Sequence, residues 1–145
     1  MLMLRNDFPP HPISATAAPC RLAFIETRVP AGFPSPAQDY LEDEIDLSSY
    51  LIRNPAATYV MRVEGHSMQG AGIMDGDLVI IDKSLTATSG RIVIACQGGE
   101  FTIKRLRQDK YGAWWLCPEN PEFKATKCAD DCEIWGVVVG CVRRF

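Results

Sequence analysis

Proline is distributed unevenly along this chain of 145 residues, and its distribution constrains the fold more than any other feature. Seven of the ten prolines fall within the first 36 residues. Because each proline fixes φ and removes a backbone hydrogen-bond donor, we expect this segment to be an extended arm that cannot fold alone. We therefore expect an N-terminal arm over residues 1–39 and a folded domain over residues 40–145.

The expected folded domain carries an almost purely β pattern. From residue 58 onward, stretches of branched and aromatic residues are separated by turn residues, and Asp75-Gly76 and Gly98-Gly99 are the clearest turns. The stretches expected as strands are residues 58–63, 78–81, 91–95, 101–104, 114–116 and 134–142. Their spacing favours a compact sheet or barrel, so the expected fold class is mostly β with an extended N-terminal arm.

Two weaker signals precede this pattern. Asp46 is a good N-cap residue and Pro55 stops a helix, so a short helix is expected over residues 47–54. Within the arm, partly alternating apolar residues between Cys20 and Val29 predict a short strand that could lie along a partner surface.

Composition and charge argue against several classes of protein. Hydrophobic residues make up 47% of the chain, which is ordinary for one globular domain. A net charge of −3 and a pI near 5.3 give no basic surface for nucleic acid, so direct DNA binding is not expected. The longest apolar stretch, residues 134–142, is too short to span a bilayer, and no signal-peptide pattern follows Met1. We therefore expect a cytoplasmic protein that does not associate with membranes.

Six cysteines raise the question of disulfides or a metal site. In the reducing compartment expected for this chain, free thiols are the simpler interpretation. Cys128 and Cys132 lack the usual two-residue spacing of a zinc site, and the only histidines, His11 and His66, lie far away in the sequence. The sequence therefore predicts no metal and no cofactor.

Ser67 and Lys104 are the candidates for catalysis, because together they could form a serine nucleophile and its base. A serine hydroxyl is a weak nucleophile until a neighbouring base takes its proton. An ordinary lysine is almost fully charged at neutral pH, so Lys104 can act as a base only if burial lowers its pKa. Alternation along the expected strand places Lys104 on the same face as Thr102 and Leu106, with Arg105 turned away.

The surroundings of Ser67 leave alternatives open. By itself, a serine among glycines is most simply a turn residue, and a lone strand lysine is most simply solvated. Alternatively, the glycines form a tight turn that exposes Ser67 and directs backbone N–H groups, such as those of Ser67 and Met68, at an oxyanion. His66 is another candidate base, but consecutive residues of an extended segment point to opposite faces, so His66 should not reach the Ser67 hydroxyl.

The arm contains a segment that could be a substrate for such a site. Ala31 and Gly32 have almost no side chain, which would let the backbone approach Ser67 closely. Val29 could fill a small apolar pocket, and Pro30 would stiffen the approach. A tethered substrate has a high effective concentration even when its affinity is poor. Taken alone, however, the Ala31-Gly32 dipeptide is an ordinary loop.

Five motifs follow one another along the chain. They are GFPSPA at 32–37, PAATY at 55–59, GHSM at 65–68, DGDLVI at 75–80 and GEFTIK at 99–104. Together, with their intervals, they resemble the UmuD family of the LexA-type self-cleaving serine peptidases. The resemblance covers most of residues 21–106 and thins towards the C-terminus.

The resemblance implies that Ser67 is the nucleophile, Lys104 the general base, and the bond between Ala31 and Gly32 the one that is cleaved. It also implies a LexA- or signal-peptidase-like β fold and a homodimer. The implied activator is the RecA filament on single-stranded DNA, and the implied partner in the SOS response is a Y-family translesion DNA polymerase subunit. His66 departs from the family, which often has an acidic residue there, so the pH response of cleavage is left open.

Two other functions are compatible with the sequence. The first is a catalytically inactive β module that scaffolds a polymerase or a repressor partner. The second is a repressor or anti-repressor fragment, which would need a DNA-binding domain. The roughly thirty proline-rich residues before the expected cut are too few and too broken for a helix-turn-helix domain.

Overall fold

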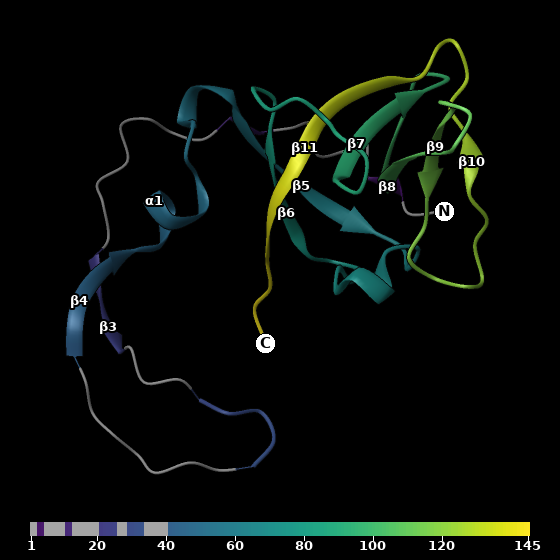
Figure 1. Cartoon of the computed structure of the whole chain (residues 1–145). Coiled ribbons are helices and arrows are strands. Elements are labelled where there is room, and N and C mark those ends of the chain that lie inside the picture. Colours follow the sequence, from purple (N-terminus) through teal and green to yellow (C-terminus); the bar gives the residue numbers. More distant parts are fainter. Residues whose placement is uncertain (1–2, 5–10, 13–20, 26–28, 34–40) are drawn as a thin grey trace. The chain divides into compact units, whose positions relative to one another are not determined.

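The computed structural model describes residues 3–4, 11–12, 21–25, 29–33 and 41–145. They belong to two compact units, one of Thr16–Arg53 and one of Met1–Ala15 together with Asn54–Phe145. Figure 1 shows the β-rich larger unit and the strands and helix of the smaller unit. The division of the chain into an arm over residues 1–39 and a peptidase domain over residues 40–145 stays a prediction.

The smaller unit contains a two-stranded antiparallel sheet. Strand β3 (Arg21–Ile25) pairs with β4 (Leu41–Asp46), and Leu22 lies opposite Ile45. The strand predicted between residues 20 and 29 is therefore confirmed as β3. Its partner β4 was not predicted, because four of its six residues are acidic and acidic residues are depleted in strands.

Helix α1 (Leu47–Leu51) follows β4 directly. The carboxylate of Asp46 caps it by accepting hydrogen bonds from Ser48 N at 3.2 Å and Ser49 Oγ at 2.8 Å. The predicted helix is confirmed, but it ends at Leu51 rather than at residue 54. Ile52 is already extended, and Pro55 opens a separate 3-10 turn, η1 (Pro55–Ala57).

The larger unit is built on one sheet of antiparallel pairs, and all six predicted strands are present in it. They are β5 (Thr58–Glu64), β6 (Leu78–Asp82), β7 (Ile92–Gln97), β8 (Glu100–Gln108), β9 (Trp114–Cys117) and β11 (Glu133–Val142). Three short strands and a second 3-10 turn were not predicted: β1 (Met3–Leu4), β2 (His11–Pro12), β10 (Thr126–Lys127) and η2 (Gln69–Ala71). The predicted fold class, mostly β, is confirmed.

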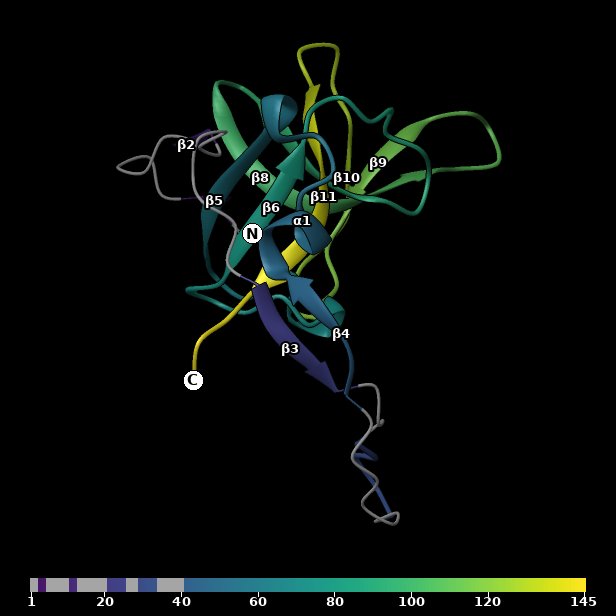
Figure 2. The same cartoon turned by 90° about the vertical axis from the view of Figure 1, so that its left-hand side faces the viewer.

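The order of strands makes the sheet close on itself. From β5 the path runs through β6, β11 and β7 to β8, and β1 pairs with both β5 and β8. Strands β9 and β10 continue beyond β8, and β2 pairs with β5. Figure 2 shows β5, β6 and β11 side by side on one face of this unit. The strands that precede Ser67 and carry Lys104, β5 and β8, are thus joined through the same short strand.

The predicted turn at Gly98-Gly99 connects β7 to β8 in two residues. Gln97 pairs with Glu100, and the two glycines have φ values of 61° and 79°. Two consecutive positive φ angles are the requirement of a type I′ hairpin turn, which favours glycine at both positions. This turn fixes the register of β8 and therefore the position of Lys104 opposite Val93.

The apolar side chains of the larger unit form two clusters on the two faces of the sheet, and β7 contributes to both. Ile92 and Ile94 pack in the first cluster, whereas Val93 and Ala95 pack in the second, as the alternation of a strand requires. The buried members of the first cluster are Met61, Val63, Met68, Ile73, Val79, Ile81, Ile94 and Ile103. Those of the second are Val93, Ala95, Leu106, Leu116 and Val137. No helix within the described part of the chain is long and apolar enough to cross a membrane.

Candidate active site

The structure brings Ser67 and Lys104 together, although they are 37 residues apart in the sequence. Ser67 lies in the loop between β5 and η2, and Lys104 lies in the middle of β8. The Nζ atom of Lys104 is 3.1 Å from the Oγ atom of Ser67, which is hydrogen-bond distance. Proton transfer between a nucleophile and its base requires this distance.

Lys104 is buried on the face of β8 that the sequence predicted. Thr102, Lys104 and Leu106 are 5%, 3% and 3% exposed, whereas Arg105 between them is half-buried. Val93 lies opposite Lys104 on β7 and, like Leu106, belongs to the second apolar cluster. Removal of the ammonium group from water lowers the pKa of Lys104 from its ordinary value of 10.5 to about 8. About one-fifth of the lysine is then neutral at pH 7.4, instead of about one part in a thousand.

The hydrogen-bond partners of Lys104 suit a neutral amine. Nζ contacts Thr102 Oγ1 at 2.9 Å and the Ile103 carbonyl oxygen at 3.0 Å, in addition to Ser67 Oγ. A neutral amine has two hydrogens and one lone pair. Its two hydrogens can be donated to Thr102 and Ile103, which leaves the lone pair to accept the proton of the Ser67 hydroxyl.

The prediction that the glycine turn exposes Ser67 is wrong, because Ser67 is fully buried, with 0% of its surface exposed. A segment after β9 lies against the loop: Glu119 N donates to the Ser67 carbonyl oxygen at 2.8 Å, and Asn120 Nδ2 donates to the His66 carbonyl oxygen at 2.8 Å. Met68, the other predicted backbone donor to an oxyanion, is also fully buried, in the first apolar cluster.

His66 is exposed, whereas Ser67 next to it is buried. Residues 65–68 form a bend and a turn rather than an extended segment, so the predicted alternation of His66 and Ser67 does not apply, and Met68 is buried as well. The four residues of the predicted cleavage segment, Val29 to Gly32, belong to the smaller unit, and all four are exposed there. Val29 has 91% of its surface accessible.

A small cavity of about 150 Å³ lies beside the lysine. Its lining residues are Gln97, Glu100, Thr102, Lys104, Leu116 and Thr126. Leu116 gives the cavity an apolar surface, and Thr102 and Thr126 contribute hydroxyl groups. A cavity of this size has room for a small apolar side chain.

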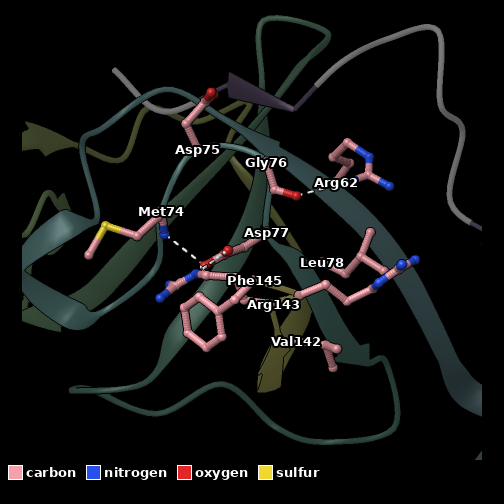
Figure 3. A pocket seen from close by; sticks show the side chains of 10 residues that line it. Arg62, Met74, Asp75, Gly76, Asp77, Leu78, Val142, Arg143 and Phe145 are labelled. Atoms are coloured by element: carbon pink, nitrogen blue, oxygen red, sulfur yellow. Dashed lines mark hydrogen bonds and ion pairs between the residues drawn. The ribbon is translucent and has the colours of Figure 1, made fainter.

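A larger cavity, of about 690 Å³, is lined by residues of the turn before β6 and of the C-terminus, and Figure 3 shows it from close by. Asp77 is buried there and accepts hydrogen bonds from Arg143 Nε at 2.7 Å and from Met74 N at 2.8 Å. These hydrogen bonds, those to Arg143 above all, lower the pKa of Asp77 to about 2. Arg62 Nη1 donates to the Gly76 carbonyl oxygen at 2.8 Å. The charged side chains of Asp77 and Arg62 thus stabilise the turn before β6. Asp75 of the same turn accepts a hydrogen bond from Gly65 N, at the start of the Ser67 loop.

Five cysteines in the described part of the chain carry free thiols: Cys96, Cys117, Cys128, Cys132 and Cys141. Cys20 lies outside the described residues. Among the residues that the structure describes, no group of three or more His, Cys, Asp or Glu side chains could hold a metal ion.

Sequence reasoning missed Glu119 and Asn120. Both contact the Ser67 loop through atoms that carry no sequence signal, a backbone N–H group and an amide side chain, from more than fifty residues away. Thr102 was placed on the correct face, but its hydrogen bond to Lys104 was not foreseen.

Known proteins of similar sequence identify the family of this chain. The chain belongs to the peptidase S24-like family, whose sequence pattern matches residues 23–139. It is 46% identical over 120 residues to protein MucA of Salmonella typhimurium, a match that covers 81% of each chain. It is 46% identical over 117 residues to protein SamA of the same species, again over 81% of each chain. The LexA repressor of Acidithiobacillus ferrooxidans is 41% identical over 121 residues, which are 80% of this chain and 58% of that protein. The predicted resemblance to the UmuD family of LexA-type peptidases is confirmed.

Proposed function

We propose that this chain is a serine peptidase that cuts its own N-terminal arm, residues 1–39, between Ala31 and Gly32. The observation that carries the proposal is the 3.1 Å contact between Ser67 Oγ and Lys104 Nζ, at a lysine whose pKa burial lowers to about 8. An activated serine next to a base with a pKa near the working pH is the arrangement that nucleophilic catalysis requires. Residues 40–145 would form the peptidase and dimerisation domain.

The proposed reaction has two steps. Neutral Lys104 takes the proton of the Ser67 hydroxyl while Oγ attacks the carbonyl carbon of Ala31. The backbone N–H groups of Ser67 and Met68 donate hydrogen bonds to the resulting oxyanion. When the tetrahedral intermediate collapses, the bond to Gly32 N breaks and Lys104 returns the proton to the leaving amine. Water, deprotonated by Lys104, then hydrolyses the ester between Ser67 and Ala31.

The exposed arm and the small cavity support this choice of bond. Ala31 and Gly32 offer an accessible backbone with almost no side chain. We propose that Val29, which is exposed in the smaller unit, enters the cavity of about 150 Å³ beside Lys104 during cleavage. Pro30 would hold the segment extended between the two contacts.

Membership of the family supports a role for the processed protein in the SOS response. We propose a homodimer in the cytoplasm that is activated by the RecA filament on single-stranded DNA. After cleavage it would act as an accessory subunit of a Y-family translesion DNA polymerase. The net charge of −3 does not favour direct binding to DNA.

The first experiment is an intact-mass measurement of the full chain. We expect a fragment that starts at Gly32 after incubation at mildly alkaline pH, or with RecA, ATP and single-stranded DNA. The matched control is Ser67→Ala, which should stay intact under both conditions. A wild-type chain that stays intact, or a cut at another bond, would refute the proposal.

The full burial of Ser67 favours a second candidate, an inactive β module that scaffolds a polymerase or a repressor partner. The same measurement separates the two, because the inactive module predicts no cut in the wild type. The partner role is tested by titrating the polymerase with a chain that starts at Gly32 and with full-length Ser67→Ala. Equal affinities would mean that cleavage does not switch the partner.

A further inference from the structure

Two consecutive residues after β9, Glu119 and Asn120, hold the loop that carries Ser67 on both sides of the nucleophile. Glu119 N donates to the Ser67 carbonyl oxygen at 2.8 Å, and Gly70 N donates to the Glu119 carbonyl oxygen at 2.7 Å. Asn120 Nδ2 donates to the carbonyl oxygen of His66 at 2.8 Å. The backbone of Ser67 is therefore fixed from outside its own loop.

The side chain of Glu119 makes the second connection, to the strand that carries Lys104. Its Oε1 atom accepts a hydrogen bond from Arg105 Nε, and Arg107 Nη2 lies 3.7 Å from the same oxygen. Arg105 is the next residue after Lys104 on β8, and its Nη1 donates to the Gly90 carbonyl oxygen at 2.7 Å. Because two acceptors hold the guanidinium of Arg105, it is a fixed support for Glu119 rather than a free surface charge.

Gly70 shows that the approach of Glu119 to the loop is built into the sequence. A Cβ atom at position 70 would lie 2.5 Å from the Glu119 carbonyl oxygen, a distance that no side chain tolerates. Gly70 does not have a positive φ, so glycine is needed here for space and not for backbone conformation. The segment after β9 can thus come close enough to bind Gly70 N and Ser67 O only because residue 70 is glycine.

We propose that Glu119 is a positioning residue for the self-cleavage proposed above, on which this inference rests. Its carboxylate is held by Arg105 on the strand of the base, and its backbone holds Ser67 in the loop of the nucleophile. Glu119 thereby sets the distance of 3.1 Å between Ser67 Oγ and Lys104 Nζ. A displacement of about 1 Å at a reacting pair can cost about a hundredfold in rate.

A partly buried ion pair can affect stability as well as position. The side chains of Arg105 and Glu119 are 24% and 28% exposed, so water screens their attraction only in part. The cleavage rates are therefore compared well below the melting temperature of each variant, where every protein is folded. The lysine itself stays buried, so its pKa should not change.

The test replaces Glu119 by Gln, which keeps the shape of the side chain and removes its charge. The matched control is Glu122→Gln, which removes the same charge from an exposed side chain three residues further on. The cleavage rate at Ala31-Gly32 is measured against pH by intact mass, beside the melting temperature of each variant.

For Glu119→Gln we expect a plateau rate about tenfold to a hundredfold lower, with the midpoint of the pH profile still near that of the wild type. Glu122→Gln should follow the wild type in both. A Glu119→Gln variant that cleaves at the wild-type rate would overturn the proposal. So would one that cleaves slowly only because its melting temperature has fallen towards the assay temperature.

A double-mutant cycle tests whether Arg105 and Glu119 act as one unit. If they do, Arg105→Gln combined with Glu119→Gln is as slow as the slower single variant, because the second change removes a contact that is already lost. If the rate reductions of the two single variants multiply in the double variant, Arg105 and Glu119 act independently and the proposal is overturned. Gly70→Ala keeps both charges, and it should also slow cleavage because it pushes the Glu119 backbone away from the loop.

A phosphonate probe that reacts with activated serines separates failure of this inference from failure of the proposed function. If wild-type Ser67 is labelled but the arm is not cut, the proposed substrate is wrong, and slower labelling of Glu119→Gln still supports positioning. Equal labelling of the two proteins would overturn positioning whether or not the arm is cut. A wild type that is neither labelled nor cut would overturn both.

Discussion

Replacing Lys104 by Met should raise the free energy of unfolding above that of the wild type at neutral pH. At alkaline pH this gain should be smaller. Below about pH 8 the wild type folds with a buried ammonium group, which costs free energy because the group leaves water. Methionine has a similar length and no charge. The gain should therefore depend on pH in a way that only the titration of Lys104 explains.

The size of the effect follows from the pKa of Lys104, which is lowered from 10.5 to about 8. Between these values the unfolded chain still holds the proton and the folded protein has lost it, so the stability of the wild type rises with pH. At about 1.4 kcal/mol per pH unit the rise is about 3 kcal/mol. Below about pH 8 and above about pH 10.5, Lys104 has the same charge in the folded and unfolded states, so its contribution to the free energy of unfolding does not change with pH. The stability difference between Lys104→Met and the wild type should thus fall by about 3 kcal/mol from pH 7 to pH 10.5.

Urea unfolding followed by tryptophan fluorescence measures this difference. Both proteins carry Ser67→Ala, so that neither is cut during the experiment. Burial raises the pKa of Cys132 to about 12 and that of Cys141 to about 11, above the ordinary value of 9.0. Their thiols therefore weaken both proteins above about pH 9, where the unfolded chain ionises first. This loss is common to the two proteins and cancels in the difference.

The hydrogen bonds that Lys104 makes to Thr102 and Ile103 are lost at every pH, so they shift the whole difference curve without changing its slope. A difference that is constant from pH 7 to pH 10.5 would show that the pKa of Lys104 is not lowered. The neutral base on which the proposed reaction depends would then be missing at physiological pH.

Three further outcomes are expected. The cleavage rate should rise with a midpoint near pH 8 and level off above about pH 9, and His66→Ala should follow the same curve; a second, lower midpoint that this variant removes would instead indicate a histidine base. Val29→Trp should leave the melting temperature unchanged, because Val29 is 91% exposed, but should slow cleavage, since the much larger tryptophan side chain has to enter the cavity in place of valine; an unchanged rate measured by intact mass would disprove the assignment of the cavity. Arg143→Ala leaves the buried carboxylate of Asp77 without its cation and should lower the free energy of unfolding measured in urea; the wild type, in which the pKa of Asp77 is about 2, should lose this advantage as the pH falls from about 4 to 2, and a pH-independent difference would contradict the ion pair.

The sequence predicted those parts of the fold that depend on local pattern. The six predicted strands of the larger unit are stretches rich in branched and aromatic residues, and the period of two along β8 placed Lys104 on the buried face with Thr102 and Leu106. The turn at Gly98-Gly99 followed from two residues that both accept a positive φ. In each case the information lies within a few neighbouring residues.

The parts that were missed depend on contacts between distant segments. Strand β4 is an acidic stretch with low intrinsic preference for a strand, and it is one only because β3 pairs with it. The burial of Ser67 was missed because the glycines around it suggested exposure, and the segment that binds the backbone of its loop begins at Glu119, far along the chain. No pattern in the Ser67 loop specifies that partner. Only Gly70, which leaves space for the Glu119 carbonyl oxygen, carries a trace of it.

Burial of the dyad links the chemistry of the proposed site to its choice of substrate. The apolar surroundings that lower the pKa of Lys104 are part of the same packing that leaves Ser67 with no exposed surface. A site made reactive in this way is, by the same packing, closed to other proteins in solution. A tethered segment suffers less from this closure, because its effective concentration at the site remains high even when each docking event is rare. On the proposed function, the rate of cleavage is then limited by how often the arm enters the site, and an activator can raise it by favouring that docking without changing Lys104 or Ser67.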